Sequence, residues 1–231
     1  MRESKYIVIE GIIEQLEIFK AQVQFLANAE NTQRTAGLVA TIQAAAGEAG
    51  AVHSAQAAND SGDPVEGFKM VLGAQTVTGN FWETTFQNGD HVRAVGAMQG
   101  KVFHAVAVVK SDNGVIWMKP HCERGSIAKK KQLIKNSLAF AGLVFLVDGI
   151  LLRNSHYPLW VLLAMPAAAV TVILAVTVGM SWKDFMFLAR EMDEVGAALG
   201  IPAPATIDLV KSTKKSRRQG NPELPMGVFY L

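Results

Sequence analysis

Residues 158–180 read PLWVLLAMPAAAVTVILAVTVGM, a run without a charged side chain. About 20 such apolar residues are enough for a helix to cross the hydrocarbon core of a bilayer. A second apolar run, SLAFAGLVFLVDGILL at residues 137–152, comes just before it, and only a link of a few residues separates the two. So short a link predicts an antiparallel transmembrane hairpin with spans at about 133–152 and 158–180.

The two spans differ in how readily they should enter lipid. Each good aliphatic residue of the second span contributes roughly −0.3 to −0.6 kcal/mol, and Pro166 is expected to kink this helix without ending it. The first span carries Asp148, which costs roughly 2.5 to 3.5 kcal/mol at the bilayer centre and less near an edge. Asp148 is therefore the candidate functional residue within the membrane, or a carboxylate that reaches the outer interface near Arg153 and His156.

Basic residues predict the orientation of the hairpin. Lysines precede the first span, Lys183 and Arg190 follow the second, and the link offers only Arg153. The positive-inside rule then places both termini in the cytoplasm and the link on the outer side of the membrane. Basic side chains expected to face anionic lipid are Lys129, Lys130, Lys131, Lys135, Lys214, Lys215, Arg217 and Arg218.

Composition limits the remaining possibilities. The chain has 231 residues and a formal charge of +2, and its one cysteine, Cys122, excludes an intrachain disulfide. The first residues lead directly into a segment of alternating polarity, so export by the general secretory route is not expected.

The region before the hairpin predicts a small β-rich domain at residues 1–128. Residues 6–26 alternate apolar with polar side chains, as two strands or one long bent strand would. Further strands are predicted at 68–72, 76–84, 91–97, 102–109 and 115–119, separated by turn signals at Gly73, Asn88-Gly89-Asp90, Gln99-Gly100 and Asp112-Asn113-Gly114. Short strands at this spacing indicate a small barrel.

The segment FQNGDHVRAVG at 86–96, followed by VFHAVAV, resembles the middle of small OB-like barrels, in which Gly and Asp form a corner before a strand. Such a barrel can bind nucleic acid through surface aromatics and basic side chains. No dense basic stripe accompanies the aromatic residues here, which predicts that they pack in the core. These residues are Phe81, Trp82, Phe86, Phe103 and Trp117.

Three further segments complete the predicted α+β membrane protein. Residues 35–58 are rich in Ala and Gly and fit an interfacial helix, a mobile insertion or a conditional membrane segment. Apolar residues at helical spacing over 182–199 predict an amphipathic helix, on the membrane or against the barrel, that ends at Gly200-Ile-Pro202. It opens a C-terminal region, 181–231, whose basic tail is followed by NPELPMGVFYL, an edge strand for the barrel or for another chain.

Catalytic and metal-binding patterns are weak in this sequence. His121 and Cys122 are adjacent, but sequence neighbours usually point apart, whereas a nucleophile and its base must converge. One cysteine and five scattered histidines show none of the usual ligand spacings for a metal. We therefore predict a non-enzymatic protein without a metal or cofactor.

Four stretches carry a resemblance to a known family: FWETTFQNGDHVRAVG, IWMKPHCERG, the hairpin, and AALGIPAPATIDLVKSTKKSRR with PELPMGVFYL. Together they resemble a family, found in Burkholderia and related proteobacteria, that is assigned as type VI secretion system effectors through genomic association. The resemblance implies a place in interbacterial competition, as an effector, an immunity protein or an accessory protein. It implies no active site.

These observations lead to one leading hypothesis and two alternatives. The leading hypothesis is an inner-membrane immunity or accessory component that acts through contacts with lipid and with a protein partner or a second copy of itself. The first alternative is a delivered toxin that perturbs the membrane, with Asp148 lining a polar path. The second is a membrane-tethered nucleic-acid-binding module, for which nucleic acid is the less favoured partner.

Overall fold

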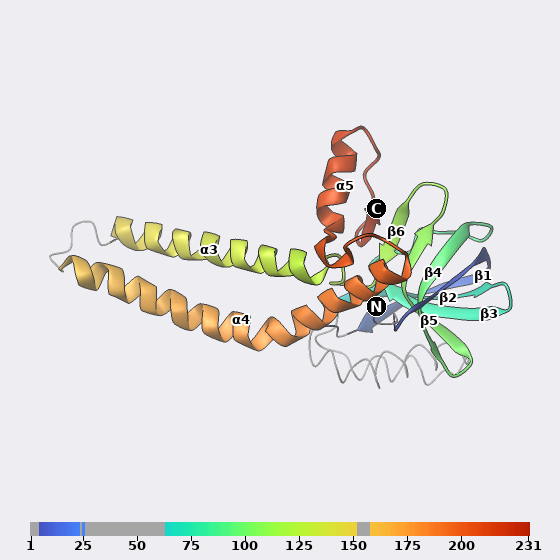
Figure 1. Cartoon of the computed structure of the whole chain (residues 1–231), viewed down its shortest axis with the longest axis horizontal. Helices are drawn as coiled ribbons and strands as arrows, with labels where there is room; N and C mark the ends of the chain where they lie inside the picture. Colours follow the sequence, from blue (N-terminus) through green and yellow to red (C-terminus); the bar gives the residue numbers. More distant parts are fainter. Residues whose placement is uncertain (1–4, 24, 26–62, 152–157) are drawn as a thin grey trace.

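The computed structural model describes residues 5–23, 25, 63–151 and 158–231, and it consists of a β-barrel from which two long helices project (Figure 1). The insertion predicted at 35–58 and the link at 153–157 lie outside these residues. Strands of the sheet are β1 (Ile7–Val23), β2 (Asp63–Leu72), β3 (Gln75–Phe81), β4 (His91–Gln99), β5 (Val102–Lys110), β6 (Val115–Met118) and β7 (Val228–Tyr230).

The first five strands close into a barrel, which confirms the predicted architecture. Strand β1 pairs with β2 and β4, β2 pairs with β3, and β4 pairs with β5, all antiparallel. The ring closes through a parallel pairing of β3 with β5, between Thr76–Thr78 and Val102–His104. Four of the five pairings around the ring are antiparallel and one is parallel, because an odd number of strands cannot alternate in direction all the way around a ring.

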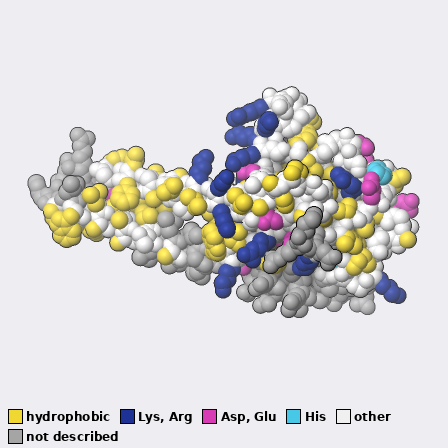
Figure 2. All heavy atoms as spheres, viewed as in Figure 1, with side chains coloured by type: hydrophobic (Ala, Val, Ile, Leu, Met, Phe, Trp, Pro, Cys, Tyr) yellow, Lys and Arg dark blue, Asp and Glu magenta, His cyan; other side chains and the backbone are white. Residues whose placement is uncertain are grey.

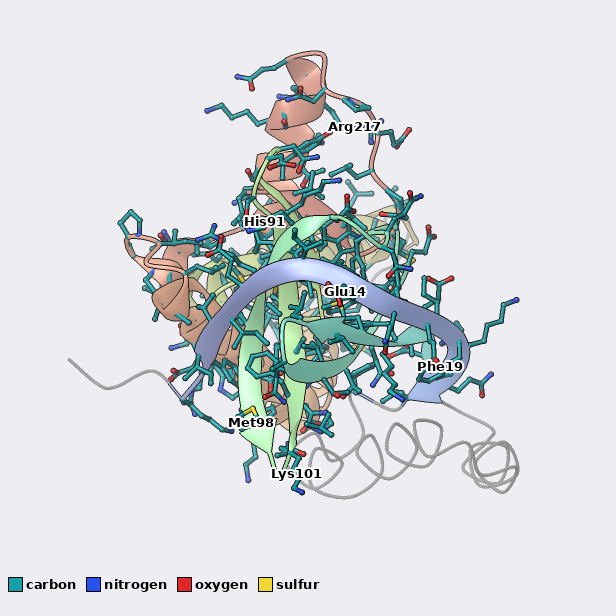
Figure 3. The ribbon with its side chains drawn as sticks, turned by 90° about the vertical axis from the view of Figure 1, so that its right-hand side faces the viewer. Glu14, Phe19, His91, Met98, Lys101 and Arg217 are labelled. Atoms are coloured by element: carbon teal, nitrogen blue, oxygen red, sulfur yellow. The ribbon has the colours of Figure 1, made fainter. Side chains whose placement is uncertain are left out.

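Of the two predictions for residues 6–26, the single long bent strand is correct. Its first part, Ile7–Ile12, pairs with β4, and its second part, from Ile13 to Val23, pairs with β2. The bend is a bulge after Glu14, where Gln15 adopts a left-handed backbone conformation with φ of 50°. One strand therefore serves two sides of the barrel and arches across its end (Figure 3).

The predicted Asn-Gly-Asp corner forms and holds the bulge in place. Gly89 has a φ of 92°, and its N–H donates to the carbonyl of Ile13 at 2.9 Å. The side chain of Asn88 accepts from the N–H of Leu16 at 2.9 Å. Asp90 caps the turn by accepting from the N–H of Gln87 at 3.0 Å, and its other carboxylate oxygen contacts Lys110 at 2.6 Å.

Aromatic residues fill the barrel, as predicted. Phe68, Phe81, Phe86 and Trp117 are buried and stack edge to face or tilted, with ring centroids 5.0 to 6.4 Å apart. The indole N–H of Trp117 donates to the hydroxyl of Thr85 at 3.1 Å. Four of the five predicted core aromatics, Phe103 included, are thus core residues, whereas Trp82 is only half-buried.

Helices α3 (Ser126–Leu151) and α4 (Leu159–Ala198) run side by side and project from the barrel (Figure 1). Helix α4 is continuous over 40 residues, with Pro166 inside it as predicted. The amphipathic helix expected at 182–199 is therefore the last part of α4 rather than a separate element, since no Gly or Pro interrupts the chain between the two. Among the described residues, one helix, Ser126–Ile150, has the length and composition to cross a membrane.

The end of α4 packs on the outside of the barrel and forms a second core. Leu188, Met192 and Val195 of α4 are buried there against strands β4, β5 and β6. Burial of each such side chain contributes about 1.5 to 3 kcal/mol. Helix α4 is therefore joined to the barrel by a packed interface as well as by the chain.

The C-terminal segment folds back onto the barrel. It contains a 3₁₀ turn, η1 (Pro204–Thr206), a helix α5 (Leu209–Arg218), and β7, which pairs antiparallel with β6. The basic stretch at residues 211–218 lies in helix α5, whose first turn is capped by Asp208. The predicted edge strand is confirmed, and it pairs within the same chain.

We predict that Asp90 makes barrel stability depend on pH. Burial alone would raise the pKa of Asp90, but the hydrogen bonds from Lys110 and from the Gln87 N–H lower it below its usual value. Stabilisation from this carboxylate is then complete above about pH 4 and is lost as the pH falls through the lower pKa of the folded state. Asp90→Asn should cost up to about 1 kcal/mol at pH 7 and less at pH 3.

Urea unfolding of the full chain in neutral micelles, followed by tryptophan fluorescence, measures this difference. Asp112→Asn is the control, because Asp112 is an exposed turn residue. An equal cost of Asp90→Asn at both pH values would contradict the assignment.

Candidate functional site

The candidate site begins with an exposed apolar surface on the helical arm, by which we mean residues 133–151 of α3 and 159–180 of α4. None of the most apolar residues of α3 is buried within the structure. Large apolar side chains that are exposed along the arm include Ile134, Leu138, Leu143, Leu146, Ile150, Trp160, Leu163 and Met165. The core helix of a soluble domain would be mostly buried, whereas an exposed apolar surface of this size is typical of a site of contact with a membrane or with another protein.

Two tryptophans mark the ends of the apolar part of α4. Trp160 is 71% exposed near the tip of the arm, and Trp182 is 36% exposed near its base. At about 1.5 Å per residue they lie about 33 Å apart along the helix. This matches the hydrocarbon core, about 30 Å thick, and tryptophans are enriched at both of its interfaces.

Basic residues gather where the arm leaves the barrel and along α5, whereas the visible face of the arm is hydrophobic (Figure 2). We call this group the basic collar. Its members are exposed and comprise Lys130, Lys131, Lys135, Lys183, Arg190, Lys211, Lys214, Lys215, Arg217 and Arg218. The collar contains seven of the eight residues predicted to face lipid.

Lys129 is the exception among the predicted lipid-facing residues. It is buried, its ammonium lies 3.9 Å from a carboxylate oxygen of Glu123, and it sits 4.8 Å from the ring centroid of Phe185. The ammonium interacts with this carboxylate and with the aromatic ring instead, so the prediction that Lys129 faces lipid is wrong.

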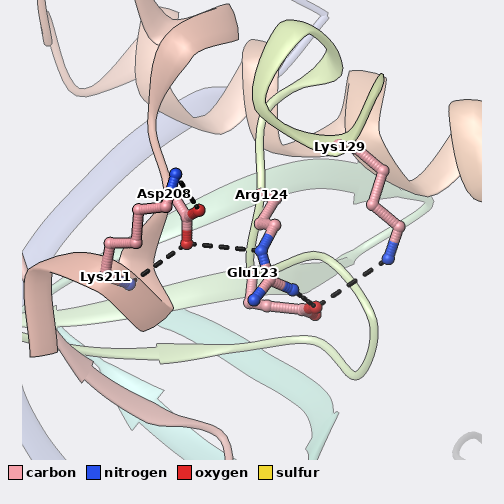
Figure 4. A network of polar contacts seen from close by, with 5 residues as sticks. All are labelled: Glu123, Arg124, Lys129, Asp208 and Lys211. Carbon is pink, nitrogen blue, oxygen red and sulfur yellow. Dashed lines mark hydrogen bonds and ion pairs between the residues drawn. The ribbon is translucent and has the colours of Figure 1, made fainter. Parts of the chain in front are cut away.

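A polar network joins the base of the arm to α5 (Figure 4). Arg124 contacts Glu123 at 2.7 Å and Asp208 at 3.3 Å, and Asp208 also contacts Lys211 at 3.4 Å. The carboxylate of Glu123 reaches Lys129 on the other side. Arg124, Glu123 and Asp208 are largely buried, so the network fixes the first turn of α3 relative to the first turn of α5.

Backbone contacts tighten the same junction. The N–H of Ser126, in the first turn of α3, donates to the Asp193 carboxylate of α4 at 2.8 Å, so each helix of the pair helps to fix the other. Gly125 lies so close to η1 that a Cβ there would overlap the carbonyl oxygen of Pro204 and come within 2.7 Å of Ala205. Only glycine fits at this position without a backbone shift.

A buried carboxylate, Glu191, locks α4 to the barrel. It accepts from the Tyr6 hydroxyl at 3.0 Å, from the Lys119 ammonium at 2.8 Å and from the Cys122 thiol at 3.4 Å. Burial and the charge of Glu191 raise the pKa of Tyr6 and of Cys122, which keeps both groups protonated. Removal of one partner of such a buried ion pair typically costs about 3 to 5 kcal/mol.

The structure separates the two residues that were weighed as a catalytic pair. Cys122 is buried against Glu191, whereas His121 points to Asp63, with Nε2 2.9 Å from a carboxylate oxygen, and packs edge-on against Trp82. His121 has a φ of 66°, a left-handed conformation that turns the two side chains apart. In the part of the chain that the structure describes, no group of three His, Cys, Asp or Glu side chains is arranged to hold a metal.

Asp148 lies on α3 within one turn of Leu151, near the tip of the arm, and is half-buried. This is the end of the first predicted span that lies next to the link. It is far from the basic collar, since about 20 Å of helix separates it from Lys135.

Sequence reasoning missed the polar contacts that join the arm to the barrel. One signal was present, because Glu191 lies between Leu188 and Met192 on the face of α4 that was predicted to be apolar. A lone acid on such a face indicates a buried partner. Asp208 before a basic segment was a second signal, for an N-cap.

A comparison with protein-family models, curated proteins and solved structures found no match. The resemblance to secretion-system effectors therefore stays a prediction. The helical arm, the basic collar and the junction with the barrel are the features from which a function can be argued.

We predict that Cys122 is chemically inert in the folded protein. Its pKa is raised well above the usual value and its side chain is fully buried, so little reactive thiolate can meet a reagent. Iodoacetamide at pH 8 should label the folded chain at least about 100-fold more slowly than the urea-unfolded chain, because labelling needs local opening.

A Cys122→Ser chain with Lys101→Cys at an exposed hairpin serves as the accessible control, and mass spectrometry measures both rates. Labelling of folded Cys122 at the rate of that control would show that the thiol is accessible and the junction open.

Proposed function

We propose that this protein is a two-span membrane protein whose hairpin holds the β-barrel domain at the cytoplasmic face of a bacterial inner membrane. The observation that carries the proposal is the helical arm, where the most apolar residues of α3 are not buried and the described large apolar side chains near the start of α4, such as Trp160, Leu163 and Met165, are exposed. Lipid is the environment that removes this surface from water.

The distribution of charge supports this orientation, and the length of the arm supports a span of one bilayer. The basic collar lies at the base of the arm, on the barrel side, where the positive-inside rule places basic residues. The spacing of Trp160 and Trp182 fits one bilayer thickness. Thr171, which lies inside the second span, donates its hydroxyl to the Ala167 carbonyl at 2.7 Å, so this polar group needs no partner from lipid.

We further propose that the barrel acts through protein contacts in type VI secretion-linked competition, as a resident immunity or accessory component. The resemblance noted in the sequence supports this role. The separation of His121 from Cys122 and the burial of Cys122 favour contact over catalysis by this pair.

The proposed topology predicts which positions are reachable from outside the cell. In a Cys122→Ser chain, Pro158→Cys at the tip of the arm should react with a membrane-impermeant maleimide in intact bacteria. Gln219→Cys, at the end of α5, should react only after lysis. Both chains should stay with the membrane fraction after alkaline carbonate extraction.

Labelling of neither position before lysis, or release of the chain by carbonate, would contradict the two-span proposal. Labelling of both positions in intact cells would contradict the orientation.

The proposed resident role predicts a cost of deletion. A strain that lacks the gene should lose in competition with its parent, and a wild-type copy should restore its fitness. Equal fitness in this assay would count against a resident immunity protein.

The alternative of a delivered toxin makes a different prediction. Expression directed to the periplasm should then depolarise naive cells, and Asp148→Leu, which removes the charge from the arm, should abolish the effect.

A further inference from the structure

A groove of about 710 Å³ lies between α5 and the C-terminal segment. The groove has two walls, and its lining combines basic side chains, which come from α5, with apolar side chains, which come from both walls. One wall is α5, with Val210, Thr213, Lys214, Arg217 and Arg218, and the other is the stretch from Leu224 to Phe229.

Both walls are held in place, so the groove is preformed. Leu209 is buried at the base of α5, and the helix is anchored by the Asp208 contact with Arg124. The hydroxyl of Thr213 accepts from the N–H of Tyr230 at 2.9 Å, which ties α5 to β7. Strand β7 is in turn paired with β6. The walls would therefore lose little conformational entropy when a ligand binds.

The charge around the groove is positive and largely uncompensated. Among the described residues, Lys214, Lys215 and Arg218 make no ion pair. Arg217 contacts Glu223 at 2.8 Å, but both side chains are more than half exposed, so this pair is weak. Guanidinium and ammonium groups placed together in this way recognise phosphate.

Apolar side chains of both walls lie beside this charge. Val210 and Met226 are exposed to solvent, and Leu224 and Phe229 are half-buried. A ligand with both a phosphate and an apolar part complements this arrangement better than a free anion does.

The position of α5 places the groove close to the surface of the proposed bilayer. The helix begins beside the first turn of α3, where the Leu209 N–H donates to the Glu123 carbonyl at 3.0 Å. About 14 Å of α3 separate Ser126 from Lys135, next to the apolar arm. The headgroup layer accounts for about 5 to 8 Å of this distance, and long basic side chains span much of the rest. Figure 2 shows basic side chains of α5 on the flank nearer the arm.

We propose that this groove binds the headgroup and glycerol region of an anionic phospholipid, an inference that rests on the membrane insertion proposed above. Lys214, Arg217 and Arg218 contact the phosphate, and Met226, Val210 and Leu224 contact the apolar part. The site fixes α5, and with it the barrel, against the surface of an anionic bilayer.

The test uses the full chain in neutral micelles, titrated with short-chain phosphatidylglycerol. Amide exchange of residues 209–230 reports occupancy of the groove. Phosphatidylglycerol should slow this exchange, whereas phosphatidylcholine of equal chain length and inorganic phosphate at the same concentration should not. Lys214→Gln with Arg218→Gln should weaken binding about 25-fold, at roughly fivefold per charge.

Matched variants control for net charge and for hydrophobicity. Lys20→Gln with Lys101→Gln removes two exposed charges from the barrel, Lys101 at the β4–β5 hairpin (Figure 3), and should change affinity less than twofold. Met226→Asp places a carboxylate in the groove and should weaken binding, whereas Met98→Asp on that same hairpin should not.

Equal binding of phosphatidylcholine or of inorganic phosphate, or full affinity of the Lys214/Arg218 variant, would overturn the proposal. Tighter binding of an acidic peptide than of phosphatidylglycerol would assign the groove to a protein partner instead and would also overturn it. Carbonate extraction of the same variants separates the two proposals, because a failed lipid site leaves the arm in the membrane, whereas a failed insertion releases the chain.

Discussion

The proposed membrane insertion depends on one physical constraint, the poor solvation by water of the apolar side chains that the helical arm exposes. Its two helices contact each other along only part of their circumference, and the side chains that remain exposed are mostly aliphatic or aromatic. Helices satisfy their own backbone hydrogen bonds, so hydrocarbon can surround the arm without leaving a polar backbone group unpaired. The positions of the basic collar, of the two tryptophans and of Asp148 all become understandable once a bilayer occupies the space around the arm.

The junction between arm and barrel fixes how the barrel is oriented relative to the arm. Helix α4 passes without interruption from the arm onto the barrel, where Glu191 and the second core hold it. The Arg124 network and the Asp193 contact fix α3 and α5 to the same junction. Buried pairs of this kind stabilise little in net terms but are costly to break, so they specify one geometry. The barrel therefore has a defined orientation relative to the arm, rather than being tethered loosely.

Local patterns predicted much of this fold, because strand alternation, Gly-containing turns and apolar runs are properties of a few adjacent residues. The bent first strand, the Asn-Gly-Asp corner and the aromatic core followed from such patterns. The parallel closing seam and the merger of α4 into one helix depend on closure of the ring and on chain continuity, which no short window reveals. In the candidate site, the basic residues were predictable from composition, whereas the burial of Lys129 and the partners of Glu191 arise from contacts between distant segments.

The depth of single tryptophans in vesicles tests the central claim most directly. Full-length chains that keep only Trp160, only Trp182 or only Trp117 would be reconstituted with lipids that carry quenchers at different depths. The account predicts that Trp160 and Trp182 are quenched most by shallow quenchers, from opposite leaflets, and that Trp117, buried in the barrel, is not quenched. Absence of lipid quenching at Trp160 would contradict it, because the arm would then lie outside the bilayer.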